Sequence, residues 1–222
     1  LGLRTFKARP TVEDVDLQAN RNILQQAQES GVSRFVFISV LHGAEIATKA
    51  PIIAPREQFV AQLKQSDLNW TVLRPTGAFN DLQEVFRLAQ RGWGIVLADG
   101  HHRINPVHGA DIAQVVVRSL SDPGLQNSEF DFGGPHTYTQ AELPQIAADA
   151  LGAQLRTVHL PLWTITAAAG LLAPFNPNAS GFLKFFAVGA GIEQVGTPVG
   201  THSLEDFYAA LAQPTPIEAR AN

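Results

Sequence analysis

Two short apolar segments flanking a helical segment constrain the fold of this chain more than any other feature. Residues 34–38 and 70–73 are rich in β-formers with little polar alternation, a pattern typical of strands buried on both faces. Between them Phe59, Val60 and Leu63 recur at helical spacing, and Pro55 suits the first turn of a helix. A strand, a helix and a second buried strand predict a βαβ unit, and therefore a parallel sheet.

Strands and helices alternate along the rest of the chain. We expect further strands at 94–98, 129–132 and 155–160, and further helices at 11–30, 80–91, 109–120 and 139–152. The apolar positions of the helix at 109–120 predict a buried face made of Ile112, Ala113, Val116, Val117 and Leu120. The fold class that follows is α/β, a parallel sheet flanked by helices.

Several helix ends carry their own signals. Residues 80–83 and 139–142 have the spacing of capping boxes. Gly152 is expected to end one helix and Ser203 to cap the last one.

Composition excludes several functional classes. The 222 residues carry a formal net charge of -4 and no basic block, so nucleic acid is not an expected partner. The absence of cysteine excludes disulfides, thiolate metal sites and a cysteine nucleophile, and it fits a cytoplasmic protein. His101 and His102 are adjacent, but no carboxylate or third ligand stands at metal-binding spacing from them, so we predict no metal site.

The C-terminal third differs from the rest. Residues 160–183 carry no charged side chain, but Pro161, Pro174 and Pro177 interrupt the run, whereas a membrane-spanning helix needs about 20 consecutive apolar residues. We expect two short apolar helices in a small, mostly helical lobe over one end of the sheet. This predicts a sheet domain at 1–152 and a lobe at 153–222, whose apolar surface faces a substrate, a protein partner or a membrane interface.

Four phrases of the chain, in this order, resemble the atypical short-chain dehydrogenase/reductase superfamily, in particular its NmrA-like NAD(P)H-binding branch. They are VDLQANRNILQQAQESGVSRFVFISVLHG, REQFVAQLKQSDLNWTVLRPTGAF, RINPVHGADIAQVVV and EFDFGGPHTYTQAEL. The resemblance implies a Rossmann-like sheet, binding of NADP or NAD, and a small-molecule substrate held beneath the C-terminal lobe.

The resemblance places Ser39 and Arg56 at catalytic positions. Ser39 matches a serine at a strand end whose hydroxyl bonds a substrate carbonyl beside the nicotinamide. Arg56 stands where the family has a lysine that holds the nicotinamide ribose. The family's tyrosine, four residues earlier, is Ile52 here and can neither donate nor accept a proton, and the permanently charged Arg56 cannot replace it. The structural alternatives are a serine that satisfies a loop amide and an arginine paired on the helix surface.

A cofactor loop follows from the same resemblance. Pro75, Thr76, Gly77 and Phe79 match the loop that borders the nicotinamide, where backbone groups bind the carboxamide and the Thr76 hydroxyl reaches a phosphate. Plain turn chemistry is the alternative for this segment.

The substrate side is predicted at a second turn. Asn105 and His108 match a recurrent turn of the family that faces the substrate, although His108 equally suits a structural role at a helix start. The proton donor that replaces the tyrosine would be His42, His108 or a water on Ser39.

The N-terminal part departs from the family pattern. A Rossmann site cradles the pyrophosphate on a glycine-rich turn that opens a helix after the first strand. Neither GxGxxG nor GxxGxxG occurs before Val15, and the sequence begins with Leu1 and contains no methionine. We therefore expect a truncated chain with impaired cofactor binding and no basis for choosing between NAD and NADP.

Three functional interpretations follow. The first is an NAD(P)(H)-binding protein of this type, with hydride transfer to a small carbonyl or olefinic substrate; the missing tyrosine leaves open whether the chain is an enzyme. The second is a non-catalytic sensor or assembly factor of the same fold that binds a protein partner through its apolar lobe. The third is a fragment without autonomous activity, whose exposed sheet edge would tend to pair.

Overall fold

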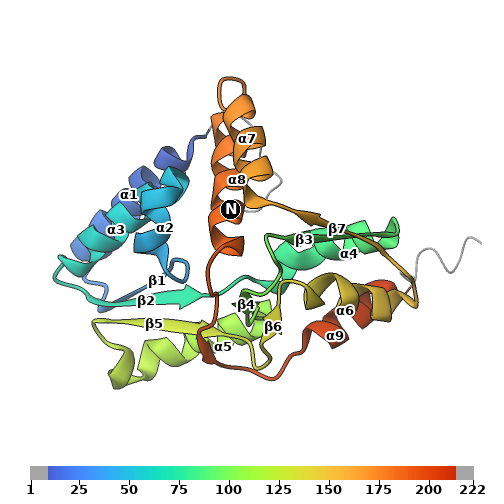
Figure 1. Cartoon of the computed structure of the whole chain (residues 1–222). Helices are drawn as coiled ribbons and strands as arrows, with labels where there is room; N and C mark the ends of the chain where they lie inside the picture. The colour runs from blue at the N-terminus through green and yellow to red at the C-terminus, as the bar shows by residue number, and fades with distance from the viewer. Residues whose placement is uncertain (1–9, 214–222) are drawn as a thin grey trace, which may run out of the picture.

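The computed structural model of the protein describes residues 10–213. Its main sheet has four parallel strands in the order β1-β2-β5-β8, of which β1, β2 and β5 are labelled side by side in Figure 1. The strands are β1 (Arg34–Ile38), β2 (Asn69–Pro75), β5 (Ser128–Gly133) and β8 (Thr197–Pro198). The predicted α/β class is confirmed. The expectation of a truncated start at Leu1 lies outside the described residues.

The two strands that led the prediction differ in burial. β2 is almost wholly buried between β1 and β5. β1 is only half-buried, because no other strand in the described part of the chain pairs with its second edge. The prediction of full burial is therefore right for β2 and wrong for β1.

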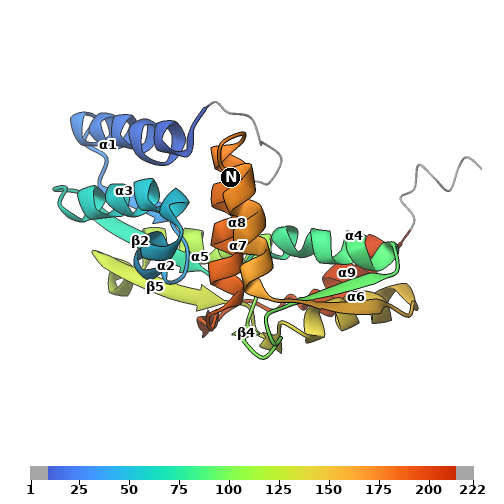
Figure 2. The same cartoon turned by 45° about the horizontal axis from the view of Figure 1, so that its top comes forward.

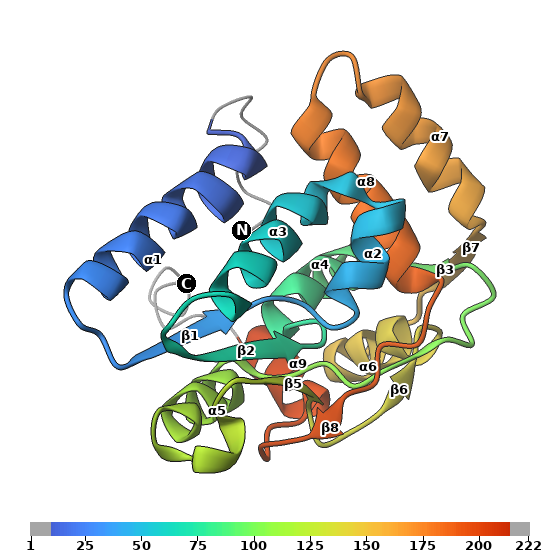
Figure 3. The same cartoon turned by 90° about the vertical axis from the view of Figure 1, so that its left-hand side faces the viewer.

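Helices cover both faces of this sheet, as Figure 3 shows. One face carries η1 (Glu13–Ala19), α1 (Asn20–Glu29) and α3 (Ala54–Lys64), and the other carries α5 (Gly109–Ser121). On the first face Phe59 and Leu63 are fully buried and pack with Val72 of β2. Each such side chain contributes roughly 1.5–3 kcal/mol when it leaves water. The predicted βαβ unit from β1 through α3 to β2 is confirmed.

The buried face of α5 is only partly the predicted one: Ile112 and Val116 pack against the core, but the other predicted residues are exposed. Val117 and Leu120 are 66% and 56% exposed, whereas Asp111, Val115 and Ser119 are buried. Two of these buried residues are polar, and each is tolerated there because its side chain has a hydrogen-bond partner. Ser119 donates to the carbonyl of Val116, and Asp111 bonds a histidine described below. A face chosen by hydrophobicity alone therefore misses part of the true one.

A second core lies beyond the carboxyl ends of the main sheet. It involves the parallel pair β3–β7, the short antiparallel pair β4–β6, and the helices α4, α6 and α9. Their bounds are β3 (Trp93–Leu97), β7 (Arg156–Leu160), β4 (Arg103–Ile104), β6 (Tyr138–Thr139), α4 (Gln83–Gln90), α6 (Glu142–Leu151) and α9 (Leu204–Ala212). Tyr208, Phe79 and Leu204 are fully buried in this core. Since α6 packs against α9, the predicted boundary at 152/153 separates two helices in direct contact; the two-domain division stays a prediction.

The predicted helix ends are mostly present. Gly152 ends α6 with a φ of 60°, and the Ser203 hydroxyl accepts the amide of Asp206 at the start of α9. The capping box at 139–142 is half formed, since the Glu142 carboxylate accepts the amide of Thr139. The capping box predicted at 80–83 is absent: the 3₁₀ turn η3 (Phe79–Leu82) leads into α4, and neither element has a side-chain cap.

The apolar run forms the two short helices that were predicted, α7 (Leu162–Leu172) and α8 (Pro177–Ala190). They lie side by side as an antiparallel hairpin (Figures 1 and 2). α8 packs on α2 (Gly43–Lys49) and η2 (Pro51–Ile53) beside the sheet. Within residues 10–213 no helix is both long enough and apolar enough to cross a membrane.

Candidate functional site

The predicted site residues gather at the carboxyl ends of β1 and β2. Backbone bonds continue the sheet past both strands: the Ser39 amide donates to the Leu73 carbonyl at 2.8 Å, and the Thr76 amide donates to the Phe132 carbonyl at 2.9 Å. Ser39 and Thr76 are therefore fixed by the register of the sheet. In open parallel sheets ligands bind at this edge.

Ser39 belongs to a buried ion-pair network. Its side-chain oxygen lies 2.6 Å from Oε1 of Glu57, to which it donates a hydrogen bond, and Ser39 is only 2% exposed. The guanidinium of Arg74 binds both carboxylate oxygens of Glu57, at 2.9 and 2.7 Å. It also donates to Glu129 at 2.5 Å, and Lys64 bonds the other oxygen of Glu129 at 2.6 Å. The catalytic role predicted for Ser39 stays a prediction, and in this structure its proton points to Glu57.

The charges of this network balance one another. Burial lowers the pKa of Arg74, but the bonds from Glu57 and Glu129 outweigh it and raise that pKa above its ordinary value. Burial raises the pKa of Glu129, and the bonds from Lys64 and Arg74 reverse this and hold it below the usual range. Both shifts favour the charged forms of Arg74 and Glu129, as a partly buried ion pair requires.

Arg56 is bound on the other side of β1. Its guanidinium contacts both oxygens of the buried Asp16 carboxylate, at 3.1 and 3.2 Å through Nη2, and donates to the carbonyl of Ile38. It therefore ties the first helix to the end of β1. The ribose-holding role predicted for Arg56 stays a prediction; the Asp16 partner is far away in sequence and was not foreseen.

The predicted cofactor loop and the predicted substrate turn form one unit. The Thr76 hydroxyl donates to the Asn105 carbonyl at 2.6 Å, the Val107 amide to the Gly77 carbonyl, and the Phe79 amide to the Val107 carbonyl. The buried Asn105 side chain in turn bonds Gly134 and Gly196. The structure thus brings together the segments that sequence reasoning singled out separately.

The described residues fit only part of a dinucleotide. In the segment after β2, the amides of Gly77 and Ala78 have no acceptor among residues 10–213, so they are donors available to a carboxamide. For the pyrophosphate, the described residues offer no glycine-rich strand-to-helix turn. For residues 10–213 we therefore expect donors for the nicotinamide end of NAD(P)H, and this part of the chain holds no glycine-rich cradle for the phosphates.

A histidine pair lies beside this unit. His202 bonds the fully buried Asp111 carboxylate through Nδ1 at 2.8 Å, and its ring stacks on His108 at 4.3 Å between centroids. His108 accepts the amide of Ala110 through Nδ1 and so caps α5, the structural role left open above. Sequence reasoning missed Asp111 and His202, because 90 intervening residues hide their contact.

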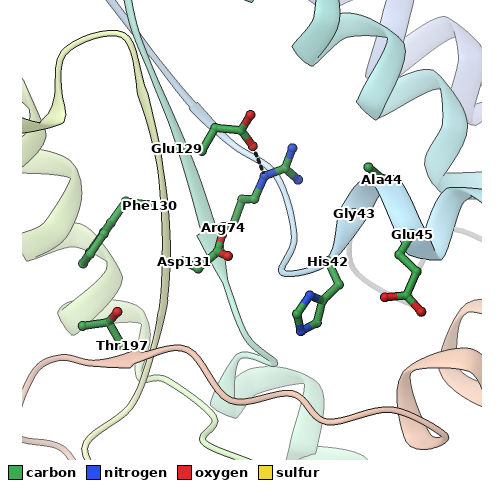
Figure 4. Close-up of a pocket in the computed structure, with 9 residues that line it drawn as sticks. All are labelled: His42, Gly43, Ala44, Glu45, Arg74, Glu129, Phe130, Asp131 and Thr197. Carbon is green, nitrogen blue, oxygen red and sulfur yellow. Dashed lines mark hydrogen bonds and ion pairs between the residues drawn. The ribbon is translucent and has the colours of Figure 1, made fainter.

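A hollow of about 500 Å³ opens between α2 and β5, next to Arg74. Figure 4 shows Glu129 and Asp131 on the Arg74 side of β5 and Phe130 on the opposite side, as strand alternation requires. His42 is the one predicted site residue that lines it, and it holds a left-handed backbone with a φ of 53°. Within residues 10–213 no group of three or more histidine or carboxylate side chains could hold a metal ion.

Comparison with known proteins assigns the chain to a family. A family model described as NAD(P)H-binding matches residues 5–123, more than half of the chain. The chain belongs to this NAD(P)H-binding family. The resemblance drawn from the four sequence phrases is thereby confirmed, together with the nicotinamide class of cofactor that the family binds.

Known relatives of this NAD(P)H-binding chain differ in function. The photosystem II assembly factor Ycf39 of Guillardia theta is 26% identical over 160 residues, covering 70% of this chain and 51% of its own length. The NAD(P)H azoreductase of Xenophilus azovorans is 24% identical over 161 residues, covering 72% and 55%. This chain thus spans about half the length of these curated relatives.

The fold is shared with a solved oxidoreductase. The crystal structure of the NADPH-dependent quinone oxidoreductase QOR2 of Escherichia coli matches with a TM-score of 0.70 at 21% identity, covering 88% of this chain and 74% of that chain. At this identity the likeness establishes the Rossmann-like architecture alone.

Proposed function

We propose that this protein is an NAD(P)H-dependent oxidoreductase that reduces a small carbonyl or olefinic substrate in the hollow beside Arg74. The observation that carries the proposal is the union of the loop at 75–79 with the turn at 105–108 at the carboxyl edge of a parallel sheet. Family membership and the azoreductase relative support it.

Backbone groups carry most of the cofactor binding in this proposal. The amides of Gly77 and Ala78 hold the nicotinamide carboxamide, and the packing of Phe79 against His108, 5.6 Å between ring centroids, keeps the loop in place. When bound, NAD(P)H supplies a hydride, that is, two electrons and one hydrogen nucleus. The remaining proton must come from the protein or from water.

His42 is the proton donor we propose. Among the proton donors proposed from the sequence, only His42 lines the hollow. His108 uses Nδ1 to accept the amide of Ala110 at the start of α5, and the Ser39 hydroxyl donates to Glu57. In reduction of a carbonyl, an imidazolium at residue 42 gives its proton to the oxygen as the carbon gains hydride, which leaves neutral imidazole and an alcohol.

Two measurements on the whole chain test this function. NADPH and NADH are titrated by fluorescence, and the loss of NADPH absorbance is followed over a panel of carbonyl and olefinic substrates. His42→Asn, which tolerates the left-handed backbone, should lower turnover at least about tenfold with little change in the NADPH dissociation constant. The matched control is His136→Gln, since His136 is exposed and outside the hollow. Absence of binding by both cofactors would sink the proposal.

A non-catalytic sensor or assembly factor is the second candidate. The hydrogen bond of Ser39 to Glu57, the ion pair of Arg56 with Asp16, the isoleucine at residue 52 and the Ycf39 relative favour it. In this case NADPH binds and no substrate of the panel is turned over. His42→Asn then changes neither the NADPH dissociation constant nor the absence of turnover. The protein partner, the two-domain division at 152/153 and the cytoplasmic location stay predictions.

A further inference from the structure

The hairpin of α7 and α8 is the most exposed apolar part of the described chain. Among large hydrophobic side chains of residues 10–213, the three most exposed are Trp163 at 69%, Leu171 at 79% and Phe175 at 85%. Figures 1 and 2 show the hairpin standing out from the sheet, with the turn at 173–176 at its far end. Leu171 and Phe175 therefore sit at its tip.

α7 has little to pack on besides α8. Ala169 is its one buried residue, and α8 carries the contacts to α2 and η2. A helix that is apolar all round is stable only when some medium or partner covers it.

Three polar side chains of the hairpin are hydrogen-bonded within it. The hydroxyls of Thr164 and Thr166 donate to carbonyls three residues earlier, at 2.7 and 2.9 Å, and the Asn176 side chain accepts the amide of Ala179 at 3.0 Å. Groups that enter hydrocarbon must be bonded in this way, because the medium offers no partner. A protein-binding surface usually presents polar groups at its rim, and residues 160–183 present no charged one.

The level of Trp163 and Lys184 along the hairpin matches a membrane interface. Trp163 lies nine residues, or about 14 Å, along α7 from Leu172, and Lys184 lies seven residues, or about 10 Å, along α8 from Pro177. Interfacial helices insert about 5–10 Å, and tryptophan and lysine are typical of the headgroup level just outside that depth.

The charges near the base of the hairpin complement anionic headgroups. Lys184 forms no ion pair within residues 10–213. The nearby acidic side chains are already paired, Glu45 with Lys49 and Glu193 with Arg103. A cation without an ion-pair partner among residues 10–213, next to an uncharged tip, favours a lipid surface that carries negative charge.

We propose that the tip of the α7–α8 hairpin inserts into the headgroup region of a phospholipid membrane, with Trp163 and Lys184 at the interface. The protein docks on one leaflet and does not span it. This inference is independent of the proposed reaction, because no residue of the hairpin lines the hollow beside Arg74.

Vesicle flotation of the purified chain tests the proposal. Vesicles of phosphatidylcholine and phosphatidylglycerol in equal parts should carry the protein, and phosphatidylcholine alone should carry less. The double variant Leu171→Ser, Phe175→Ser should weaken partitioning about tenfold or more, since both side chains leave water on insertion. The matched control is Val117→Ser, Leu120→Ser, which removes comparable exposed side chains from α5 and should bind as the unchanged protein does.

Fluorescence gives an independent readout. Brominated phosphatidylcholine in the vesicles should quench tryptophan emission, and Trp163→Phe should abolish that quenching while Trp93→Phe retains it. Failure of the chain to float, or equal flotation of both double variants, would overturn the proposal. So would self-association in solution that only the Leu171, Phe175 variant loses, which would make a second copy the occupant of the tip.

Discussion

Replacement of Glu57 by glutamine tests whether the polar side chains behind β1 and β2 stabilise the fold as one network. Arg74 is 7% exposed, and Glu57 binds it through two bonds of 2.9 and 2.7 Å. Glutamine keeps the shape and removes the charge. Loss of one partner of a buried ion pair costs about 3–5 kcal/mol. Because Glu129 still neutralises Arg74, we expect the free energy of unfolding to fall by less, about 2–3 kcal/mol.

Urea unfolding measures this loss. With a slope of about 2–3 kcal/mol/M for a chain of this size, the midpoint should fall by about 1 M. The control is Glu84→Gln, which breaks the exposed pair of Glu84 with Arg87 on α4 and should change stability by less than about 0.5 kcal/mol. Equal urea midpoints for Glu57→Gln and Glu84→Gln, at unchanged slopes, would refute the reasoning. Burial of the Glu57–Arg74 ion pair would then add nothing to its stabilising effect.

Two further predictions concern backbone and pH. Gly200 and Gly31 have similar φ angles, 76° and 67°, but a methyl at 200 would overlap the Asp111 carboxylate whereas 31 is open. Gly31→Ala should therefore cost about 1–2 kcal/mol and Gly200→Ala distinctly more in urea unfolding, and equal costs would contradict this. The amide and hydroxyl of Thr139 lower the pKa of Glu142, so its contribution to stability is present above the ordinary pKa of about 4.3 and fades as pH falls through the lower folded value. Stability measured from pH 6 down to about pH 3 should fall less steeply for Glu142→Gln, and parallel curves would count against that bond.

The fold was predictable where the sequence pattern and the packing share one cause. β2 reads as an apolar run because it is buried on both faces. Two of the prolines that interrupt the C-terminal run, Pro161 and Pro177, stand at the starts of its helices α7 and α8. The inner face of α5 was only partly predictable, since it buries Asp111 and Ser119 and exposes Val117. A hydrophobic pattern cannot signal a polar group whose hydrogen-bond partner is supplied by a distant segment.

The candidate site likewise has features that could be predicted from the sequence and features that could not. The strand ends and the loop from Pro75 to Phe79 could be located, because parallel strands place their carboxyl ends at one edge. The partners of Ser39 and Arg56 could not, since Glu57 and Asp16 reach them only through the tertiary packing of two helices on the sheet. Sequence therefore gives the place of the site more readily than the state of its side chains.

The isoleucine at residue 52 connects the site with the hairpin. Ile52 packs in one apolar cluster with Phe185 and Val188 of α8. α8 approaches so closely there that a methyl on Gly181 would lie 2.8 Å from the Ile52 side chain. A tyrosine at this position would need space that α8 fills, and it would place its hydroxyl in an apolar cluster, which is costly without a partner. Residue 52, where the resemblance expects the proton-donating tyrosine, thus forms part of the surface on which α8 packs. By this resemblance, the absence of the acid and the attachment of the apolar hairpin depend on the same residue, and we expect a reduction at this sheet edge to draw its proton from another group.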